Sequence, residues 1–165
     1  MREVSFDDFN ENAFNLIGKD WLIYAAEKDG SVNAMTASWG GLGIMWNKKV
    51  AYIFVRPQRY TKEFIDASDR MSISVFPEEL RKTGTYLGRT SGRDEDKIEK
   101  SGLKVMHYED VPYFEQSRLT MICKKLYAQN LDETSFVDKS IVDKCYPDKD
   151  FHMMYVVEIE KIFEK

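Results

Sequence analysis

Apolar and polar side chains alternate along much of this chain, and turn-forming residues separate the alternating runs. Alternation with a period of two is typical of strands, and short apolar runs bounded by turn residues are typical of strands that are buried. In the longest run the apolar phase changes between Cys123 and Leu126, which indicates a bend or a bulge. The pattern predicts strands over residues 21–26, 32–39, 50–55, 71–76, 103–107, 113–114, 118–130 and 153–163.

Helical spacing of apolar side chains is restricted to short segments between these strands. Gly18 is expected to end the first of them and Gly102 the one over residues 95–100. Gly40, Gly41 and Gly43 predict a break between strands, where the backbone bends sharply or approaches a ligand closely. The spacing predicts helices over residues 8–17, 60–67, 78–87 and 95–100, and one or two helical turns in an insertion at 131–146.

The order of these elements decides the fold class. Strands predominate and there is no regular β-α-β alternation, so the chain is predicted to be mainly β, with a closed antiparallel sheet and peripheral helices. Periodicity alone does not separate such a barrel from an α+β sandwich. With 165 residues, 43% of them hydrophobic, residues 1–165 are expected to form a single domain.

Composition excludes several classes of protein. A formal net charge of -4 argues against binding a nucleic acid through net charge. No signal region and no long apolar run is present, so we expect a cytoplasmic protein with no membrane partner. Cys123 and Cys145 lack metal-ligand spacing and are expected to be reduced thiols with open roles. No metal site and no Ser-His-Asp or Cys-His set is readable, so no side chain is assigned a catalytic role.

The stretch over residues 33–61 suits a long, flat, anionic ligand. A strand edge at residues 33–39 offers main-chain donors and acceptors to a planar ring. Arg56 and Arg59, followed by the hydroxyls of Tyr60 and Thr61, are suited to hold a phosphate. A helix that starts near Arg59 would add its N-terminal N–H groups. The expected ligand therefore has a ring at one end and a phosphate at the other.

Three motifs in order resemble a known family. Asn33-Ala34-Met35-Thr36-Ala37-Ser38-Trp39, Arg56-Pro57-Gln58-Arg59-Tyr60-Thr61 and Ser91-Gly92-Arg93-Asp94-Glu95-Asp96-Lys97 resemble the flavin reductase-like FMN-binding split-barrel family, and its flavoredoxin-type branch most closely. The resemblance implies a split β-barrel, antiparallel and Greek-key-like, with FMN at a homodimer interface. It also implies hydride transfer from NADH or NADPH to flavin N5, and electron transfer onward to a small-molecule or protein acceptor.

The same resemblance implies which residues bind the cofactor. Asn33 and Thr36 or Ser38 would bond the polar edge of the ring, while Lys97 would lie near the phosphate or the N1–O2 edge. His152 matches a histidine before the family's terminal strand and would orient cofactor or substrate, although Val157 stands where the family commonly has Gly. The full implied FMN-binding set is Asn33, Met35, Thr36, Ala37, Ser38, Trp39, Arg56, Pro57, Arg59, Tyr60, Thr61, Ser91, Gly92, Arg93, Lys97 and His152.

Each of these assignments has an alternative that involves no ligand. Trp39 could be a core residue, Arg56 and Arg59 could be surface arginines paired with acids, and Lys97 could be a solvated helix lysine. The function implied is an NAD(P)H-dependent flavin or ferric reductase. Two alternatives stay open: an FMN-holding electron carrier or redox sensor without its own efficient NAD(P)H oxidation, and a split-barrel domain that has lost its cofactor.

Overall fold

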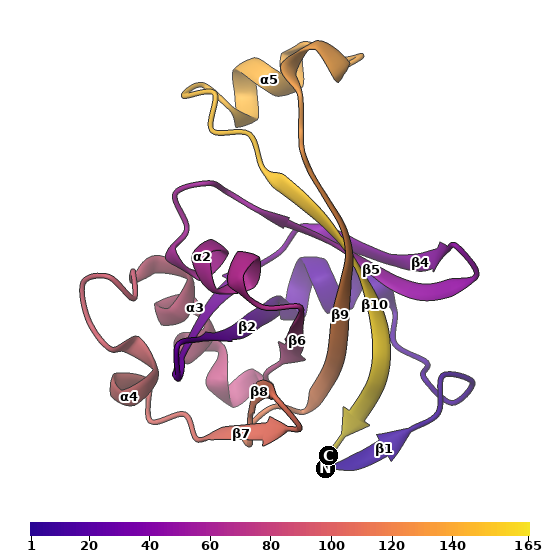
Figure 1. Ribbon diagram of the computed structural model, residues 1–165, viewed down its shortest axis with the longest axis vertical. Coiled ribbons are helices and arrows are strands. Elements are labelled where there is room, and N and C mark those ends of the chain that lie inside the picture. The colour runs from indigo at the N-terminus through magenta and orange to yellow at the C-terminus, as the bar shows by residue number, and fades with distance from the viewer.

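The computed structural model describes residues 1–165 and is built around one eight-stranded antiparallel sheet (Figure 1). Its order is β3-β2-β6-β9-β10-β5-β4, and β1 pairs with the end of β10. A separate hairpin joins β7 to β8. The strands are β1 (Arg2–Val4), β2 (Leu22–Lys28), β3 (Ser31–Ala37), β4 (Gly40–Met45), β5 (Lys48–Val55), β6 (Arg70–Val75), β7 (Val105–Tyr108), β8 (Val111–Phe114), β9 (Leu119–Asn130) and β10 (Met153–Glu164). The mainly β class is thus confirmed.

The sheet is open on one side. β3 and β4 follow one another in the chain, yet they form the two ends of the sheet and do not pair. Each has only one neighbour, β2 for β3 and β5 for β4. A hydrogen bond of 3.3 Å from the Tyr24 hydroxyl to the Trp39 carbonyl braces the connection between them. Main-chain groups on the outer edge of β3 therefore remain outside the ladder.

Five short α-helices surround the sheet, and two of them flank β3. Phe64 and Ile65 of α2 are buried in the main core, which the inner faces of the strands also line. Gly88 of α3 lies so close to β3 that an added Cβ would be 3.1 Å from Cβ of Thr36. The helices are α1 (Ala13–Asn15), α2 (Tyr60–Ala67), α3 (Arg81–Arg89), α4 (Lys97–Ser101) and α5 (Ser140–Cys145).

A long projection leaves the body of the molecule at the ends of β9 and β10 (Figure 1). It consists of residues 131–151, called the arm below, and carries a short 3-10 helix (Glu133–Ser135) followed by α5. The register between β10 and β9 shifts beside Leu126, which confirms the predicted bulge in the long strand. The arm returns to the body at His152, directly before β10.

Two predictions about the N-terminal half are wrong. The first helix begins at Ala13, because Asn12 caps it, and continues through Gly18 as a π-helical segment, Leu16–Asp20. The glycine stretch is strand β4 and not a break. An added Cβ at Gly40 would lie 2.8 Å from the Tyr52 carbonyl oxygen, so the close approach there is to strand β5.

The other predicted strands and helices are present within a few residues of their expected bounds, and β1 was not predicted. The 78–87 helix is divided into a 3-10 turn, Glu78–Leu80, and α3. Gly102 ends α4 in the left-handed conformation, as expected. None of the helices has the length and apolar character needed to cross a bilayer.

Candidate functional site

A cleft opens beside the free edge of β3 and has two connected parts. The first part, called the aromatic hollow, has a volume of about 260 Å³. The second, called the basic hollow, has a volume of about 200 Å³, and the two share Met35, Arg56 and Arg59. The aromatic hollow is lined by Met35, Thr36, Ala37, Ser38, Trp39, Phe54, Arg56, Arg59 and His152, and the basic hollow by Met35, Arg56, Gln58, Arg59, Tyr60, Thr61, Arg89, Thr90, Ser91 and Lys97.

Three rings wall the aromatic hollow. The ring centroids of Trp39 and His152 lie 5.1 Å apart, and Phe54 meets His152 edge-on at 6.5 Å. Trp39 retains 47% of its accessible surface, so the alternative that it is a core residue is wrong. A flat ring entering this hollow would meet the exposed indole of Trp39, the imidazole of His152 and residues 35–37 of β3.

The basic hollow is lined by three cations without a carboxylate partner: the exposed Arg89, and Arg59 and Lys97, which are held by carbonyl groups. Nη1 of Arg59 donates to the Gly88 carbonyl at 2.6 Å. Nζ of Lys97 donates to the carbonyls of Leu87 and Thr90 at 2.9 and 3.0 Å, at the C-terminal end of α3. Lys97 is only 4% exposed, so the alternative of a solvated helix lysine is wrong.

Burial removes water from both Arg59 and Lys97, and no negative charge replaces it. It lowers the pKa of Lys97 to about 8, and the nearby Arg59 charge contributes to that shift. Burial also lowers the pKa of Arg59, and the Arg56 charge adds to the effect. Carbonyl dipoles alone satisfy these two groups, which leaves the hollow with a positive potential suited to an anion.

Arg56 differs from Arg59 because the chain already neutralises it. Its guanidinium forms an ion pair with Asp150 and donates to the Cys145 carbonyl at 2.8 Å. Gln58 Nε2 donates to the same Asp150 oxygen at 2.7 Å, and Arg56 and Gln58 hold the pKa of that carboxyl below its usual range. The alternative of an arginine paired with an acid is therefore correct for Arg56, although its side chain still lines both hollows.

The three sequence motifs meet through direct contacts behind the cleft. Asn33 Nδ2 donates to Oγ1 of Thr61 at 3.0 Å, and both side chains are buried. An added Cβ at Gly92 would lie 2.6 Å from Oδ1 of Asn33 and 3.0 Å from the Tyr60 ring, which explains a glycine in this loop. Asn33 and Gly92 thus hold β3, α2 and the 89–94 loop together without lining either hollow.

The remaining predicted residues divide between the wall and its surroundings. Thr36 lines the aromatic hollow while its Oγ1 donates to the Gly84 carbonyl at 2.5 Å, which fixes it against α3. Arg93 lines neither hollow, because it stacks on the Tyr60 ring at 4.7 Å and pairs with Glu63. Pro57 lies in the turn before α2 and also lines neither.

Sequence reasoning missed four lining residues. Phe54 lies two positions before Arg56 on one strand, and the two-residue repeat of a strand could have placed both on one face. Gln58 lies inside a motif that was already recognised, and Arg89 and Thr90 belong to the loop predicted after α3. Of the two cysteines, Cys123 is fully buried and Cys145 is partly exposed, and neither side chain lines the hollows.

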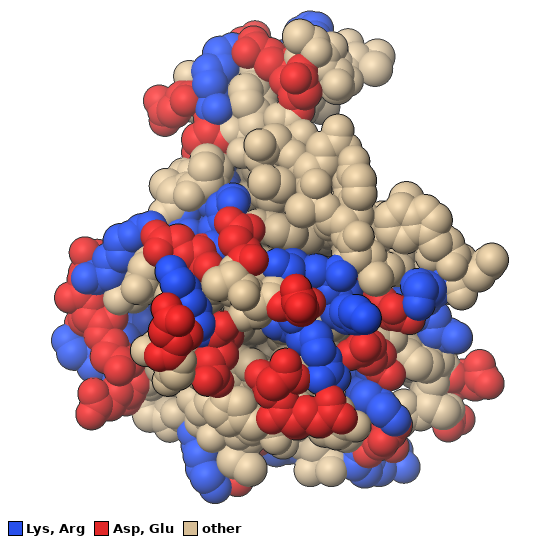
Figure 2. Space-filling model, viewed as in Figure 1, with Lys and Arg blue, Asp and Glu red and all other residues tan.

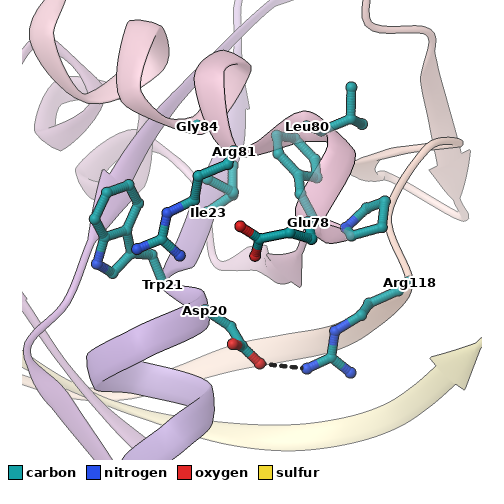
Figure 3. A pocket seen from close by; sticks show the side chains of 10 residues that line it. Asp20, Trp21, Ile23, Glu78, Leu80, Arg81, Gly84 and Arg118 are labelled. Carbon is teal, nitrogen blue, oxygen red and sulfur yellow. Dashed lines mark hydrogen bonds and ion pairs between the residues drawn. The ribbon is translucent and has the colours of Figure 1, made fainter.

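A smaller hollow beside the cleft is not a candidate site (Figure 3). It has a volume of about 50 Å³, and three of its four charged side chains, those of Asp20, Arg81 and Arg118, already have partners. Arg81 stacks on the Trp21 ring at 3.4 Å, and Arg118 pairs with Asp20 at 2.7 Å. Its volume is far below the roughly 300–1,000 Å³ of small-molecule sites.

Comparisons with solved structures place this fold among FMN-binding proteins. A domain of a flavin reductases-like enzyme from Shewanella baltica superposes with a TM-score of 0.72 at 16% identity, covering 99% of this chain and 76% of that chain. A flavoredoxin from Methanosarcina acetivorans gives 0.68 at 21% identity, with 88% and 68% covered. An FMN-binding protein from Thermus thermophilus, solved with p-hydroxybenzaldehyde bound, gives 0.69 at 18% identity, with 100% and 82% covered. These likenesses confirm the predicted split-barrel fold.

A search of curated proteins finds no match. The model of one protein family, described as the flavin reductase like domain, matches residues 17–163 and so spans nearly the whole chain, including all three motifs. The resemblance inferred from those motifs is confirmed, and this chain belongs to the flavin reductase-like domain family.

Proposed function

We propose that this protein binds FMN across the two hollows and acts as an oxidoreductase that takes hydride from NADH or NADPH and passes electrons to an acceptor. The observation that carries the proposal is a pair of cations, the buried Lys97 and the half-buried Arg59, that no carboxylate neutralises. They lie beside a hollow walled by aromatic rings and a free strand edge. A phosphate and a flat ring joined by a short chain match this arrangement.

The basic hollow fits the phosphate end of FMN. Arg59 and Lys97 supply two positive charges, and the hydroxyls of Thr61 and Ser91 supply neutral donors. Helix α2 begins at Tyr60, and its first two residues line the same hollow, so its N-terminal end would add positive potential there. Lys97 lies among the phosphate-side residues, which favours a contact to phosphate over a contact to the ring.

The aromatic hollow fits the ring end. β3 pairs only with β2, so alternate N–H and C=O groups over residues 35–37 remain available along its free edge. Met35, Trp39 and Phe54 supply apolar surface, and His152 supplies one polar ring atom. Bound FMN would supply the hydride-accepting chemistry, and the chain would bind the ring, orient it and exclude water from one side.

An absorbance titration tests this function. Purified protein is mixed with FMN, and NADH and then NADPH are added without oxygen. Binding followed by bleaching is expected, and the nucleotide that bleaches the flavin is the donor. Binding without bleaching would favour the alternative of an electron carrier or sensor, while a failure to bind would leave only the fold in common with the family.

We further propose that a second copy of the chain covers the uncharged surface between the arm and the β4–β5 hairpin (Figure 2). Ile44 and Trp46 of the hairpin, Tyr127 of β9, and Val137 and Ile141 of the arm are large apolar side chains that are at least 42% exposed. The ring centroids of Trp46 and Tyr127 lie 6.3 Å apart, so the hairpin and strand β9 form one continuous surface. A two-fold dimer buries such a surface against its own copy. Light scattering should give a mass near twice 19.3 kDa, and a mass near 19.3 kDa would contradict the dimer.

A further inference from the structure

The last residues of the arm reach back to the wall of the aromatic hollow. Tyr146 is only 3% exposed, and its ring packs against those of Phe136 and Phe151 within the arm. Its other contacts are with the cleft. Arg56 lies over the Tyr146 ring at 5.1 Å, and His152 meets that ring edge-on at 5.5 Å.

Tyr146 and His152 share one hydrogen bond, and its direction follows from the atoms available. The Tyr146 oxygen and His152 Nδ1 lie 2.8 Å apart. The Tyr146 hydroxyl forms no other hydrogen bond with the chain. If Nδ1 carried the proton and donated, the buried phenol hydrogen would lose its only acceptor, which costs free energy. The favoured arrangement has the phenol donating to an unprotonated Nδ1.

Burial, together with the nearby positive charges, keeps the His152 ring neutral. Burial lowers the pKa of His152 to about 4, and Arg56 contributes most among the charged neighbours. The Asp150 carboxylate raises the pKa of His152, but that carboxylate is already paired with Arg56 and hydrogen-bonded to Gln58. Arg59 adds a second positive charge, and burial raises the pKa of Tyr146, so the phenol stays protonated. At neutral pH the imidazole therefore carries one proton.

We propose that Tyr146 is a positioning residue that fixes this proton on Nε2, so that His152 presents one N–H donor to an acceptor atom at the ring end of the ligand. The proposal rests on the proposed function for the identity of that ligand. Nε2 forms no hydrogen bond within the chain, although the His152 ring lines the aromatic hollow. The ligand atom it suits is a ring nitrogen or a ring carbonyl oxygen of a planar heterocycle. The arm would thus determine the hydrogen bonding of the cleft without contacting the ligand.

Nitrogen NMR of the ligand-free protein tests the proton position directly. The chain has two histidines, so a His107→Gln variant leaves the signals of His152 alone. We expect a protonated-type shift for Nε2 and an unprotonated-type shift for Nδ1, unchanged between pH 8 and pH values well below the ordinary histidine pKa of 6.5. The reverse pattern, or a ring that takes a second proton near pH 6.5, would overturn the proposal.

A pair of Tyr→Phe variants separates positioning from general loss of stability. Tyr146→Phe should mix the two tautomers and weaken FMN binding roughly three- to tenfold, as expected for one neutral hydrogen bond. Tyr155→Phe is the matched control, because Tyr155 is also buried but bonds Asp66 at 2.5 Å and lies away from both hollows. It should leave the tautomer and FMN affinity unchanged. Equal losses of FMN affinity in both variants would overturn the positioning role.

The two proposals fail in different ways. Nε2–H in the free protein together with no FMN binding would overturn the proposed function and leave the positioning of His152 by Tyr146 intact. FMN binding by a protein whose His152 carries its proton on Nδ1 would overturn the positioning alone.

Discussion

Nδ2 of Asn33 lies 3.0 Å from Oγ1 of Thr61, and this buried hydrogen bond joins the edge strand of the sheet to the first turn of α2. It connects the wall of the aromatic hollow to the wall of the basic hollow. Asn33 lines neither hollow and Thr61 lines the basic one while being 1% exposed, so this contact lies mostly behind the surface of the cleft. We therefore expect a ligand that occupies both hollows to depend on this contact indirectly.

Asn33→Ala should lower the free energy of unfolding by about 1–3 kcal/mol, because it leaves the buried Thr61 hydroxyl without its partner. Denaturant unfolding measures the change. Asn10→Ala is a suitable control, since Asn10 is exposed and should change stability by less than about 0.5 kcal/mol. A loss no larger than that of the control would show that this contact does not hold β3 to α2.

Gly92→Ala should destabilise the protein and weaken FMN binding, because the added methyl group would lie 2.6 Å from Oδ1 of Asn33. A loss of about 1–3 kcal/mol is expected for overpacking of this kind. Thermal unfolding and an FMN titration measure the two effects. Gly18→Ala is the matched control: its added methyl would meet nothing within 4 Å, and it should be neutral or slightly stabilising. Similar losses in both variants would contradict the tight contact at Gly92.

Lys97→Met and Arg59→Ala should each weaken FMN binding by about 1.5–3 kcal/mol, or roughly ten- to hundredfold, because each removes a charged donor from the basic hollow. Fluorescence quenching of FMN measures the dissociation constant. Lys100→Ala is the control, since Lys100 lies on the same helix but pairs with Glu95 outside the cleft. If FMN affinity is unchanged in Lys97→Met and Arg59→Ala, the phosphate lies elsewhere.

The low pKa of Lys97 predicts opposite pH effects on stability and on ligand binding. Its pKa is about 8 in the folded protein and 10.5 ordinarily, so between these values the unfolded chain binds more protons. The free energy of unfolding should therefore gain a contribution from Lys97 as pH rises through this window. The affinity for FMN should fall above pH 8, because the amine loses the charge that attracts the phosphate.

Measurements from pH 7 to 9.5 check this prediction, with Lys97→Met as the reference. The variant has no titrating amine at this position, so the part of each pH dependence due to Lys97 should disappear. If wild type and variant show the same pH dependence of FMN affinity, Lys97 does not contact the phosphate.

Trp46→Glu should shift the protein from dimer to monomer, because it places a charge within the uncharged surface of the hairpin and the arm. Light scattering across a dilution series measures the mass. Phe14→Glu is the control, since Phe14 is 88% exposed in α1, outside this surface. A monomeric wild type, or equal dissociation in both variants, would contradict the proposed interface.

Local sequence patterns predicted the strands well because burial on a sheet leaves a repeat of two residues in the chain. The bulge at Leu126 followed from a change of phase in that repeat. The glycines of β4 were misread, because a glycine that allows two strands to approach has the same appearance in a sequence as one that allows a turn. The first helix was predicted to begin at residue 8, but residues 8–12 are not helical and Asn12 caps the helix instead.

The site was predicted from motifs, and what the motifs could not give is the pairing of charges. Arg56 and Arg59 are three residues apart and look equivalent in the sequence, yet only Arg56 meets a carboxylate. That carboxylate belongs to Asp150, near the C-terminal end of the arm. Asp150 is far from Arg56 in the sequence, so no local pattern connects the two residues. The burial of Lys97 was equally hidden, because the residue stands in a run of charged side chains.

The open side of the sheet should affect how fast its amide protons exchange with solvent. β3 and β4 are held by one neighbour each, so the amide protons along their free edges should exchange with solvent faster than those of the central strands β9 and β10. A ligand lying along β3 would form hydrogen bonds with the main-chain groups that no neighbouring strand pairs. Its binding should slow exchange in β3 far more than in β4, and the difference would identify the edge that the ligand joins.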